Sequence, residues 1–306
     1  MSYERIHSAW ERGREHILDG YSIEMTVKEL DALDAAAPLI LPDTPISVPF
    51  LPGEDIDERV RAAAHIRALG FEPMPHLSAR RIKSVDELRL VITRAAAEAG
   101  AKRALIVAGD PSKPEGPFED TLQMLRTGIF EEAGFVAVAI GGHPEGHPVV
   151  AKSVLWDFMC RKIEEIEQRG MVPLIVTQFA FDARIHLDWL EELRARGIEA
   201  PVRIGVPGPA GIKRLIRYAA FCGVGASAAV LRKYGISLGR LIGSAGPDRM
   251  VDDLRLGLWP EHGRVRLHFY PFGGLRPTME WIEAYTRKHG APTPGASHGQ
   301  EISSGQ

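Results

Sequence analysis

The chain alternates between short apolar runs and longer amphipathic stretches from about residue 21 to about residue 290. Eight of the apolar runs are rich in β-formers and have the length of a buried strand. They cover residues 21–26, 46–50, 72–76, 103–108, 136–140, 174–178, 202–206 and 265–270. Eight strands separated by helices are the number that closes a parallel (β/α)₈ barrel.

The intervening stretches carry the period of amphipathic helices. Helical spacing is clear in residues 58–68, 85–99, 149–169, 183–196 and 212–221, and a glycine follows four of these segments at positions 70, 100, 170 and 197. Glycine at such a position is typical of a helix end. Residues 205–264 are too many for one helix, so we predict about three helices between the seventh and eighth strands.

These patterns predict an α/β fold, a single-domain (β/α)₈ TIM barrel over residues 1–290. Residues 291–306 are rich in Gly, Ser and Pro and predict a disordered C-terminal tail. An open doubly wound sheet is the competing topology. We favour the barrel because of the strand number and because the chain has no glycine-rich dinucleotide-binding turn.

Composition narrows the class of protein. With 306 residues, 45% of them apolar, and a formal net charge of −3, the chain can bury a large core and lacks the basic excess of a nucleic-acid binder. Cys160 and Cys222 are the only cysteines, which excludes a disulfide framework and a four-thiolate metal site. With no signal-peptide pattern and no apolar run of about 18 residues, we expect a soluble cytoplasmic protein. Homo-oligomerisation is possible, but no sequence feature identifies an interface.

Polar residues stand at the ends of most predicted strands, where a barrel brings them together on one face. Glu24 is the most informative, because a core strand has no structural use for a carboxylate. We interpret it as a general acid whose pKa burial would raise, with pairing to an arginine as the alternative. Gln178 offers an amide beside Phe179 and Phe181, which suits a planar heterocycle, although Phe181 fits an aromatic core cluster equally well.

Two further loops have competing interpretations. Gly109-Asp110-Pro111 ends the fourth strand and offers a fixed acceptor, yet taken alone it is typical of a turn. His143, Glu145 and His147 have the side chains of a zinc or iron site. Pro144 and Pro148 break any helix that would align the two histidines, so we favour a site without metal.

Six short motifs occur in order across about residues 20 to 290: Ser22-Ile23-Glu24, Pro75-His76-Leu77-Ser78, Gly109-Asp110-Pro111, Pro144-Glu145-Gly146-His147-Pro148, Thr177-Gln178-Phe179-Ala180-Phe181-Asp182 and His268-Phe269-Tyr270. Each is weak alone, but their joint order and spacing resemble the methylenetetrahydrofolate reductase family. The resemblance implies a short, bacterial-type flavoprotein without a regulatory domain. Such an enzyme uses FAD to pass a hydride from NADH or NADPH to 5,10-methylenetetrahydrofolate, which forms 5-methyltetrahydrofolate in one-carbon and methionine metabolism.

The resemblance also implies roles for individual residues. Glu24 matches the general acid, Asp110 an acidic residue near flavin and pterin, and Gln178 a pterin-binding amide. Tyr270 and Arg276 are the other implied substrate contacts. The implied FAD contacts are His76, Ser78, Gly109, Asp110, His143, His147, Asp157 and Lys162.

The chain departs from the family pattern at several positions. Met25-Thr26-Val27-Lys28 follow Glu24 where aromatic and proline residues are usual, and Ala108 replaces an arginine before Gly109-Asp110. The arginine expected soon after Tyr270 is also missing, and Arg276 is its candidate substitute. We hypothesise that Arg80 and Arg81 compensate for the charge missing at position 108.

Three alternatives stay open at the level of sequence. The first is a relative working in demethylation or one-carbon salvage with another electron donor. The second is a metal-dependent barrel lyase built on His143, Glu145 and His147. The third is a folate-binding module without turnover.

Overall fold

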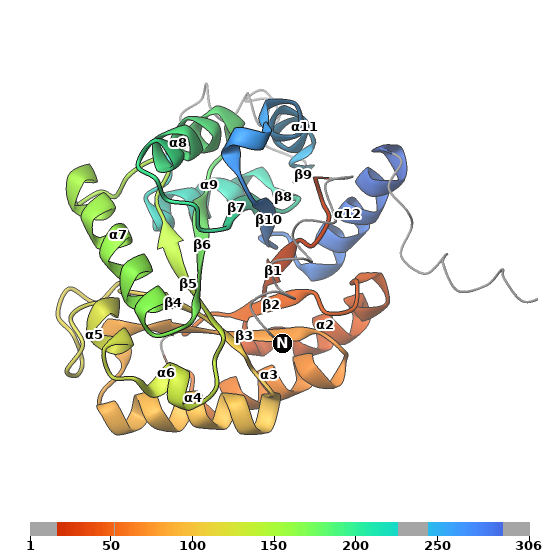
Figure 1. Ribbon diagram of the computed structural model, residues 1–306. Coiled ribbons are helices and arrows are strands. Elements are labelled where there is room, and N and C mark those ends of the chain that lie inside the picture. The colour runs from red at the N-terminus through yellow and green to blue at the C-terminus, as the bar shows by residue number, and fades with distance from the viewer. Residues whose placement is uncertain (1–16, 52, 226–243, 290–306) are drawn as a thin grey trace, which may run out of the picture.

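The computed structural model describes residues 17–51, 53–225 and 244–289, and its eight main strands form a closed parallel barrel (Figure 1). The order around the barrel is β1, β2, β3, β4, β5, β6, β7, β10, and β10 pairs with β1 to close it. The predicted TIM barrel is confirmed, and the open doubly wound sheet is excluded. The strands are β1 (Ser22–Glu24), β2 (Pro45–Val48), β3 (Glu72–Ser78), β4 (Arg103–Val107), β5 (Ala137–Gly142), β6 (Val172–Phe179), β7 (Val202–Pro207) and β10 (Val265–Tyr270).

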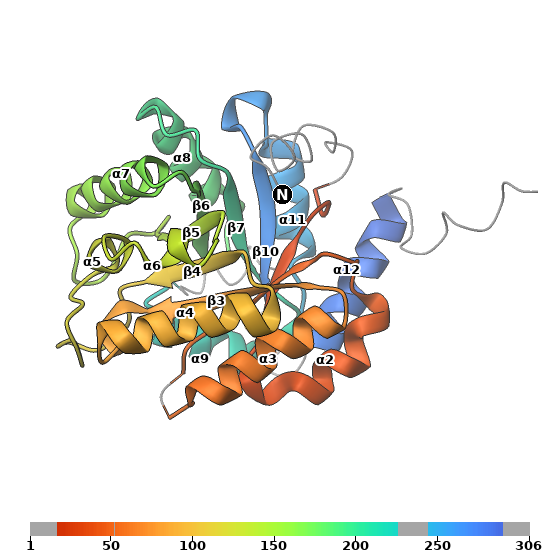
Figure 2. The ribbon, with the colours of Figure 1, turned by 60° about the horizontal axis from the view of Figure 1, so that its bottom comes forward.

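Helices surround the strands, and all five predicted segments are helical. Figure 2 shows α3 and α4 side by side along the outside of the sheet. The cap of α3 is formed by Asp55 and Glu58, whose side chains bind each other's backbone N–H groups, and Gly100 ends α4 with a positive φ of 60°. The helices are α2 (Leu30–Ala36), α3 (Ile56–Ala68), α4 (Val85–Ala99), α5 (Thr121–Leu125), α6 (Ile129–Glu132), α7 (Lys152–Gln168), α8 (Ala183–Ala195), α9 (Ile212–Cys222), α11 (Asp248–Gly257) and α12 (Leu275–His289). Short 3-10 turns are η1 (Val27–Glu29), η2 (Ala37–Leu39), η3 (Ala79–Arg81) and η4 (Pro260–His262).

The long connection between β7 and β10 carries the predicted extra helices. Its described part contains α9, α11 and the turn η4, together with a small antiparallel pair, β8 (Ala210–Gly211) and β9 (Ser244–Ala245). Residues 226–243 of this connection lie outside the described residues. So does the predicted tail over residues 291–306, and the disorder of that tail stays a prediction.

The apolar core has two parts. Outward-facing strand residues such as Ile23, Ile106 and Ile140 pack beneath the helices in the large cluster. Inside the barrel, six residues form a smaller cluster, namely Met74, Leu105, Ala137, Ala139, Leu174 and Val176. Leu105 and Val176 also line the cavity described below, so this inner cluster is the floor of that cavity.

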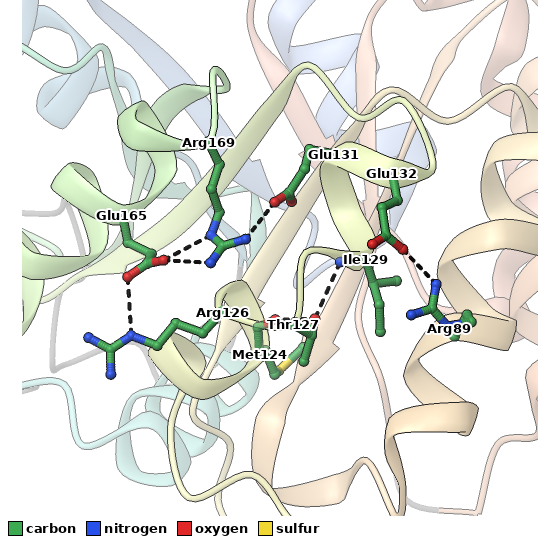
Figure 3. A network of polar contacts seen from close by, with 9 residues as sticks. All are labelled: Arg89, Met124, Arg126, Thr127, Ile129, Glu131, Glu132, Glu165 and Arg169. Carbon is green, nitrogen blue, oxygen red and sulfur yellow. Dashed lines mark hydrogen bonds and ion pairs between the residues drawn. The ribbon is translucent and has the colours of Figure 1, made fainter.

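Ion pairs join the outer helices beside β4 and β5 (Figure 3). Arg169 at the end of α7 binds Glu131 of α6 at 2.5 Å and Glu165 of α7 at 2.8 Å, and Arg126 at the end of α5 binds Glu165 at 3.1 Å. A network shared by several charges holds its geometry better than an isolated surface pair. Arg89 of α4 binds Glu132 nearby. None of the helices in residues 17–51, 53–225 and 244–289 combines the length and the apolar character that a membrane span requires.

Candidate active site

A cavity of about 360 Å³ opens at the carboxyl ends of the barrel strands. Its volume lies in the range of small-molecule sites, and its position is where TIM barrels place their chemistry. Several residues predicted from the sequence meet there: Glu24, His76, His143, Gln178 and Tyr270. The sequence-based expectation that strand ends bring these side chains together therefore agrees with the structure.

Glu24 ends β1 and faces His76 from β3 across the cavity. Its Oε2 lies 3.6 Å from Nδ1 of His76, and the hydroxyl of Ser47 donates to the same oxygen at 3.4 Å. Burial acts to raise the pKa of Glu24, but His76 in particular, together with His268 and Ser47, outweighs it and holds this pKa below its ordinary value. The expectation of a raised pKa is wrong, because β3 supplies an imidazole where sequence reasoning considered only burial or an arginine.

A second polar pair lies inside the barrel and joins β1 to the neighbouring strand β10. The Ser22 hydroxyl and Nδ1 of His268 lie 2.8 Å apart, and both side chains are fully buried. Burial lowers the pKa of His268 to about 4, so its imidazole is neutral at pH 7. Sequence reasoning gave these two residues no role. The alternation of a strand was the available signal, because Ser22 shares a face with Glu24 and His268 shares one with Tyr270.

Gln178 reaches the cavity through an irregularity in β6. The register between β6 and β7 shifts between Val176 and Phe179, and the Gln178 Oε1 accepts from the Phe179 N–H at 3.1 Å. Gly205 on β7 permits this bulge, since a Cβ there would lie 2.5 Å from the carbonyl oxygen of Thr177. A bulge of this kind re-aims a side chain at a functional site.

Aromatic rings form one wall of the cavity. Tyr218 of α9 stacks on Phe272 with ring centroids 4.2 Å apart and planes 14° apart, and Phe179 meets Phe272 edge-on at 4.9 Å. Tyr270 donates its hydroxyl to the Thr177 carbonyl at 3.0 Å. Sequence reasoning missed Tyr218 and Phe272. Phe181 is buried edge-on against Phe179, which supports its interpretation as a core residue.

Asp110 does not line the cavity. Its carboxylate is 67% exposed and is bound by the guanidinium of Arg81, while the Arg80 side chain donates to the carbonyls of Glu119 and Pro111. Gly109 lies against Ser78, and its positive φ of 93° requires glycine. Arg80 and Arg81 therefore fix the loop that follows β4, which carries the Gly-Asp-Pro motif.

The three candidate metal ligands in the loop after β5, His143, Glu145 and His147, do not point to one place. His143 lines the cavity and meets His147 edge-on at 5.6 Å, whereas Glu145 accepts from the Gly225 N–H at 2.5 Å, just beyond α9. Burial, with the charges of His147 and Lys162, lowers the pKa of His143 to about 4. Among the described residues, no group of three or more His, Cys, Asp or Glu side chains is placed to hold a metal ion. The arrangement does not support the metal-dependent lyase.

The remaining implied contacts lie on helices. Burial lowers the pKa of Lys162 on α7 to about 8, with Asp120 acting in the opposite direction. Asp157 is exposed and pairs with Arg161 at 3.4 Å, one turn along α7. Arg276 is exposed and pairs with Glu280 on α12 at 2.8 Å. None of these three predicted contacts, Lys162, Asp157 and Arg276, lines the cavity, and neither do Ser78, Gly109 and His147.

Comparison with known proteins gives one family. The family model described as methylenetetrahydrofolate reductase matches residues 51–237, more than half of the chain. "Methylenetetrahydrofolate reductase 2" of Saccharomyces cerevisiae is 27% identical over 163 residues, which are 50% of this chain and 25% of the yeast protein. "Methylenetetrahydrofolate reductase (NADH) 1" of Arabidopsis thaliana is 26% identical over 140 residues, 40% of this chain and 23% of the plant protein. The matches thus span about a quarter of each relative.

Among solved structures, the dihydropteroate synthase FolP of Thermus thermophilus aligns with a TM-score of 0.48 and 11% identity over 89% of this chain and 94% of that one. Glu24 and Tyr270 lie outside the residues that the family model matches. Their place in the site comes from the barrel itself, which sets β1 beside β10.

Proposed function

The chain belongs to the methylenetetrahydrofolate reductase family, and from this premise we propose that it is a flavin-dependent enzyme that reduces 5,10-methylenetetrahydrofolate to 5-methyltetrahydrofolate. FAD is the proposed cofactor, and NADH or NADPH is the proposed electron donor. One observation carries the proposal. A strand-end carboxyl group, Glu24, meets an imidazole and an amide, His76 and Gln178, in a single cavity of ligand size.

The residues present fit a flavin. Gly141 lies on the cavity wall, where a Cβ would lie 3.6 Å from His143 and 3.8 Å from Val107, so the glycine leaves the space between these two lining side chains open to a ligand. Nε2 of His76 is buried and has no hydrogen-bond partner among the described residues, while Nδ1 has only the Glu24 carboxylate nearby, at 3.6 Å. A buried polar atom without a hydrogen bond destabilises the fold unless a ligand or a water molecule binds it.

The cofactor's charged part has a candidate contact on α7. Lys162 is an ammonium group held partly out of water, and its charge acts on His143 at the edge of the cavity. A cation that has already lost solvent binds a diphosphate with little further desolvation cost. We propose that His76, His143 and Lys162 hold FAD, with Ser78 and Gly109 supporting the loop beside it. When bound, FAD supplies the hydride transfer.

The substrate's polar heterocycle has its own partners. The Gln178 side chain can both donate and accept, which matches the edge of a pterin ring. Tyr270, Phe179 and Phe272 offer ring faces and edges close to that amide. We propose that these residues hold the pterin with its one-carbon unit turned toward Glu24.

Glu24 is the proposed general acid. Opening the methylene bridge requires a proton on the nitrogen that leaves the bridging carbon, and we assign this proton to the Glu24 carboxyl group, which lines the cavity. The pKa of Glu24 lies below its ordinary value. A ligand that covers the cavity excludes water, which raises the pKa of a carboxyl group and favours the protonated acid.

A visible absorption spectrum tests the proposal. We expect the purified protein to show flavin bands, which bleach anaerobically with NADH or NADPH and return on addition of 5,10-methylenetetrahydrofolate. Bands that bleach only with 5-methyltetrahydrofolate would replace this function with the demethylating relative that uses another donor. A colourless protein that cannot be reconstituted with FAD would contradict the flavin and leave the folate-binding module.

A further inference from the structure

Strand β6 carries one extra residue where it meets β7. The paired residues Val176 and Phe179 are three positions apart on β6. Their partners on β7, Arg203 and Gly205, are only two positions apart. Successive residues of a regular strand point to opposite faces, yet Gln178 and Phe179 both line the cavity. The bulge therefore lets two adjacent side chains, an amide and an aromatic ring, face the cavity together.

Thr177 ties this bulge to β7. Its hydroxyl oxygen accepts a hydrogen bond from the Gly205 N–H at 2.8 Å, and its side chain is fully buried. In a regular parallel pair, such an N–H donates to a backbone carbonyl of the neighbouring strand. The Thr177 hydroxyl thus replaces a backbone acceptor that the bulge has displaced. Removal of this hydroxyl would leave a buried N–H group without its acceptor.

Other contacts fix the same stretch of backbone. The Tyr270 hydroxyl donates to the Thr177 carbonyl at 3.0 Å. Gly205 allows the two strands to approach, because a Cβ on it would lie 2.5 Å from the same carbonyl oxygen. The Phe179 N–H donates to Oε1 of Gln178 at 3.1 Å. With its oxygen held by the backbone, the Gln178 amide can turn its NH₂ group toward a ligand.

We propose that Thr177 is a positioning residue for Gln178, because its hydrogen bond with Gly205 maintains the bulge that directs the Gln178 amide into the cavity. This inference rests on the proposed function, in which that amide binds the pterin. Thr177 does not line the cavity, so it acts through the backbone of β6 and not through contact with the ligand.

Loss of the hydroxyl should move the amide. Valine has nearly the shape of threonine but cannot accept a hydrogen bond, so Thr177→Val leaves the Gly205 N–H unsatisfied. The backbone can satisfy this group only by shifting a carbonyl of β6 toward it, which alters the bulge. Gln178 would then change its position relative to the ligand, and a misplacement of about 1 Å in an active site can lower the rate by about 10²-fold.

The kinetic test compares Thr177→Val with Thr177→Ser, which keeps the hydroxyl. In Thr177→Val, kcat/KM for 5,10-methylenetetrahydrofolate is expected to fall about 10–100-fold, while flavin content stays at the wild-type level. Thr177→Ser is expected to restore most of this loss. Thr44→Val is the matched control, because it removes a buried hydroxyl that donates to the Leu41 carbonyl at the amino end of β2. This control is expected to keep the wild-type kcat/KM.

A double-mutant cycle separates positioning from general destabilisation. If Thr177 acts through Gln178, its hydroxyl has nothing to position once the amide is removed. Adding Thr177→Val to Gln178→Ala is therefore expected to lower kcat/KM by no more than about twofold beyond Gln178→Ala alone. A full additional loss in the double variant would overturn the inference, and so would an unchanged kcat/KM in Thr177→Val.

The magnetic resonance signal of the Gln178 side chain tests the inference without turnover. The chain has five glutamines, so ¹⁵N labelling of their side chains gives few amide signals, and Gln178→Ala identifies the relevant one. In the purified protein, this signal is expected to shift in Thr177→Val and to keep its wild-type position in Thr177→Ser. A signal that keeps its position in both variants would overturn the inference.

The two readouts also separate this inference from the proposed function. A wild type that reduces no folate, together with the expected shift of the Gln178 signal in Thr177→Val, would overturn the proposed function alone. If Thr177→Val does not fold, Thr177→Cys takes its place in both experiments, since a thiol is a much weaker acceptor than a hydroxyl.

Discussion

The guanidinium group of Arg81 binds both carboxylate oxygens of Asp110. Nη2 lies 2.7 Å from each oxygen and Nε lies 2.9 Å from Oδ1, while Nη1 reaches Glu115 at 3.4 Å. The Arg81 side chain is 13% exposed and the Asp110 side chain is 67% exposed, so the pair joins a largely buried arginine to a solvent-exposed carboxylate. The Gly-Asp-Pro motif is thereby fixed by a residue from the turn η3.

Arg81→Ala should loosen the loop after β4. We expect the free energy of unfolding to fall by about 1 kcal/mol, because a partly exposed bidentate pair is lost, and flavin affinity to fall with it. Denaturant titration and flavin content measure the two effects. Arg89→Ala, which removes the exposed pair with Glu132, is the control and should retain its flavin. Full flavin in Arg81→Ala and Arg80→Ala would refute the hypothesis that these arginines compensate for Ala108.

Glu24→Gln should abolish the proton donor while keeping the shape of the site. Glutamine can still accept from Ser47, so flavin content should match the wild type. Turnover should fall by about 10²–10⁴-fold, the usual contribution of a general acid. Stopped-flow measurement of flavin reoxidation by the folate isolates this step. An unchanged rate would assign the proton to another group.

His76→Gln should raise the pKa of Glu24. Burial acts to raise this pKa, and His76 is the chief group acting against it, so its removal leaves burial dominant. The protonated carboxyl group should then persist to higher pH than in the wild type. Difference infrared titration of the carboxyl band, with Glu24→Gln to identify the signal, measures the shift. A shift to lower pH would mean that His76 does not stabilise the carboxylate.

Flavin affinity should depend on pH through Lys162. Burial lowers the pKa of this ammonium group to about 8, and a bound diphosphate would raise it. Binding therefore favours the protonated form, so affinity should be constant well below pH 8 and fall above it. Fluorescence titration of apoprotein with FAD between about pH 7 and pH 9.5 measures this fall. In Lys162→Met the fall should vanish and affinity should be weaker throughout.

Two glycine substitutions should separate stability from cofactor binding. In Gly205→Ala the added Cβ meets backbone atoms of Thr177, Phe179 and Gln178 at 2.5–2.9 Å, so we expect a loss of about 2 kcal/mol or more in unfolding free energy. In Gly141→Ala the Cβ meets only side chains at ordinary distances, so stability should be kept. The methyl group would still occupy the cavity wall, and flavin affinity should fall.

Thermal unfolding and FAD titration of both variants measure these effects. Normal flavin affinity in a stable Gly141→Ala would show that the flavin does not lie against this wall. Wild-type stability in Gly205→Ala would show that the backbone of the β6 bulge can move away from the added methyl group with no loss of unfolding free energy.

The fold was predictable from the sequence because its signals are local. Strand-length apolar runs, helical periodicity and glycines such as Gly100 each act within one element, and the number of elements then selects the barrel. The meeting of Glu24, His76, Gln178 and Tyr270 followed from topology alone, since parallel strands end on one face. No side-chain detail was needed for either step.

The finer geometry of the site was not predictable, because it depends on pairs far apart in the chain. The Asp110 carboxylate faces outward, where Arg81 binds it. The local sequence around either residue gives no sign that the two form a pair. The pKa of Glu24 depends on His76, which stands on a different strand. The stack of Tyr218 on Phe272 joins α9 to the loop after β10. A long connection separates the two residues, and hydrophobic periodicity does not predict where such a connection lies relative to the barrel.

Closure of the barrel by β1 and β10 has a consequence for the order of folding. Glu24 lies on β1, whereas His268 and Tyr270 lie on β10, so this side of the acid's surroundings forms only when distant parts of the chain meet. Such contacts form slowly, since a long loop must close before they stabilise the chain. During synthesis, the nascent chain would hold the seven barrel strands β1 to β7 but an incomplete cavity until β10 leaves the ribosome. A ligand that binds this cavity would therefore select fully closed molecules over partly folded ones.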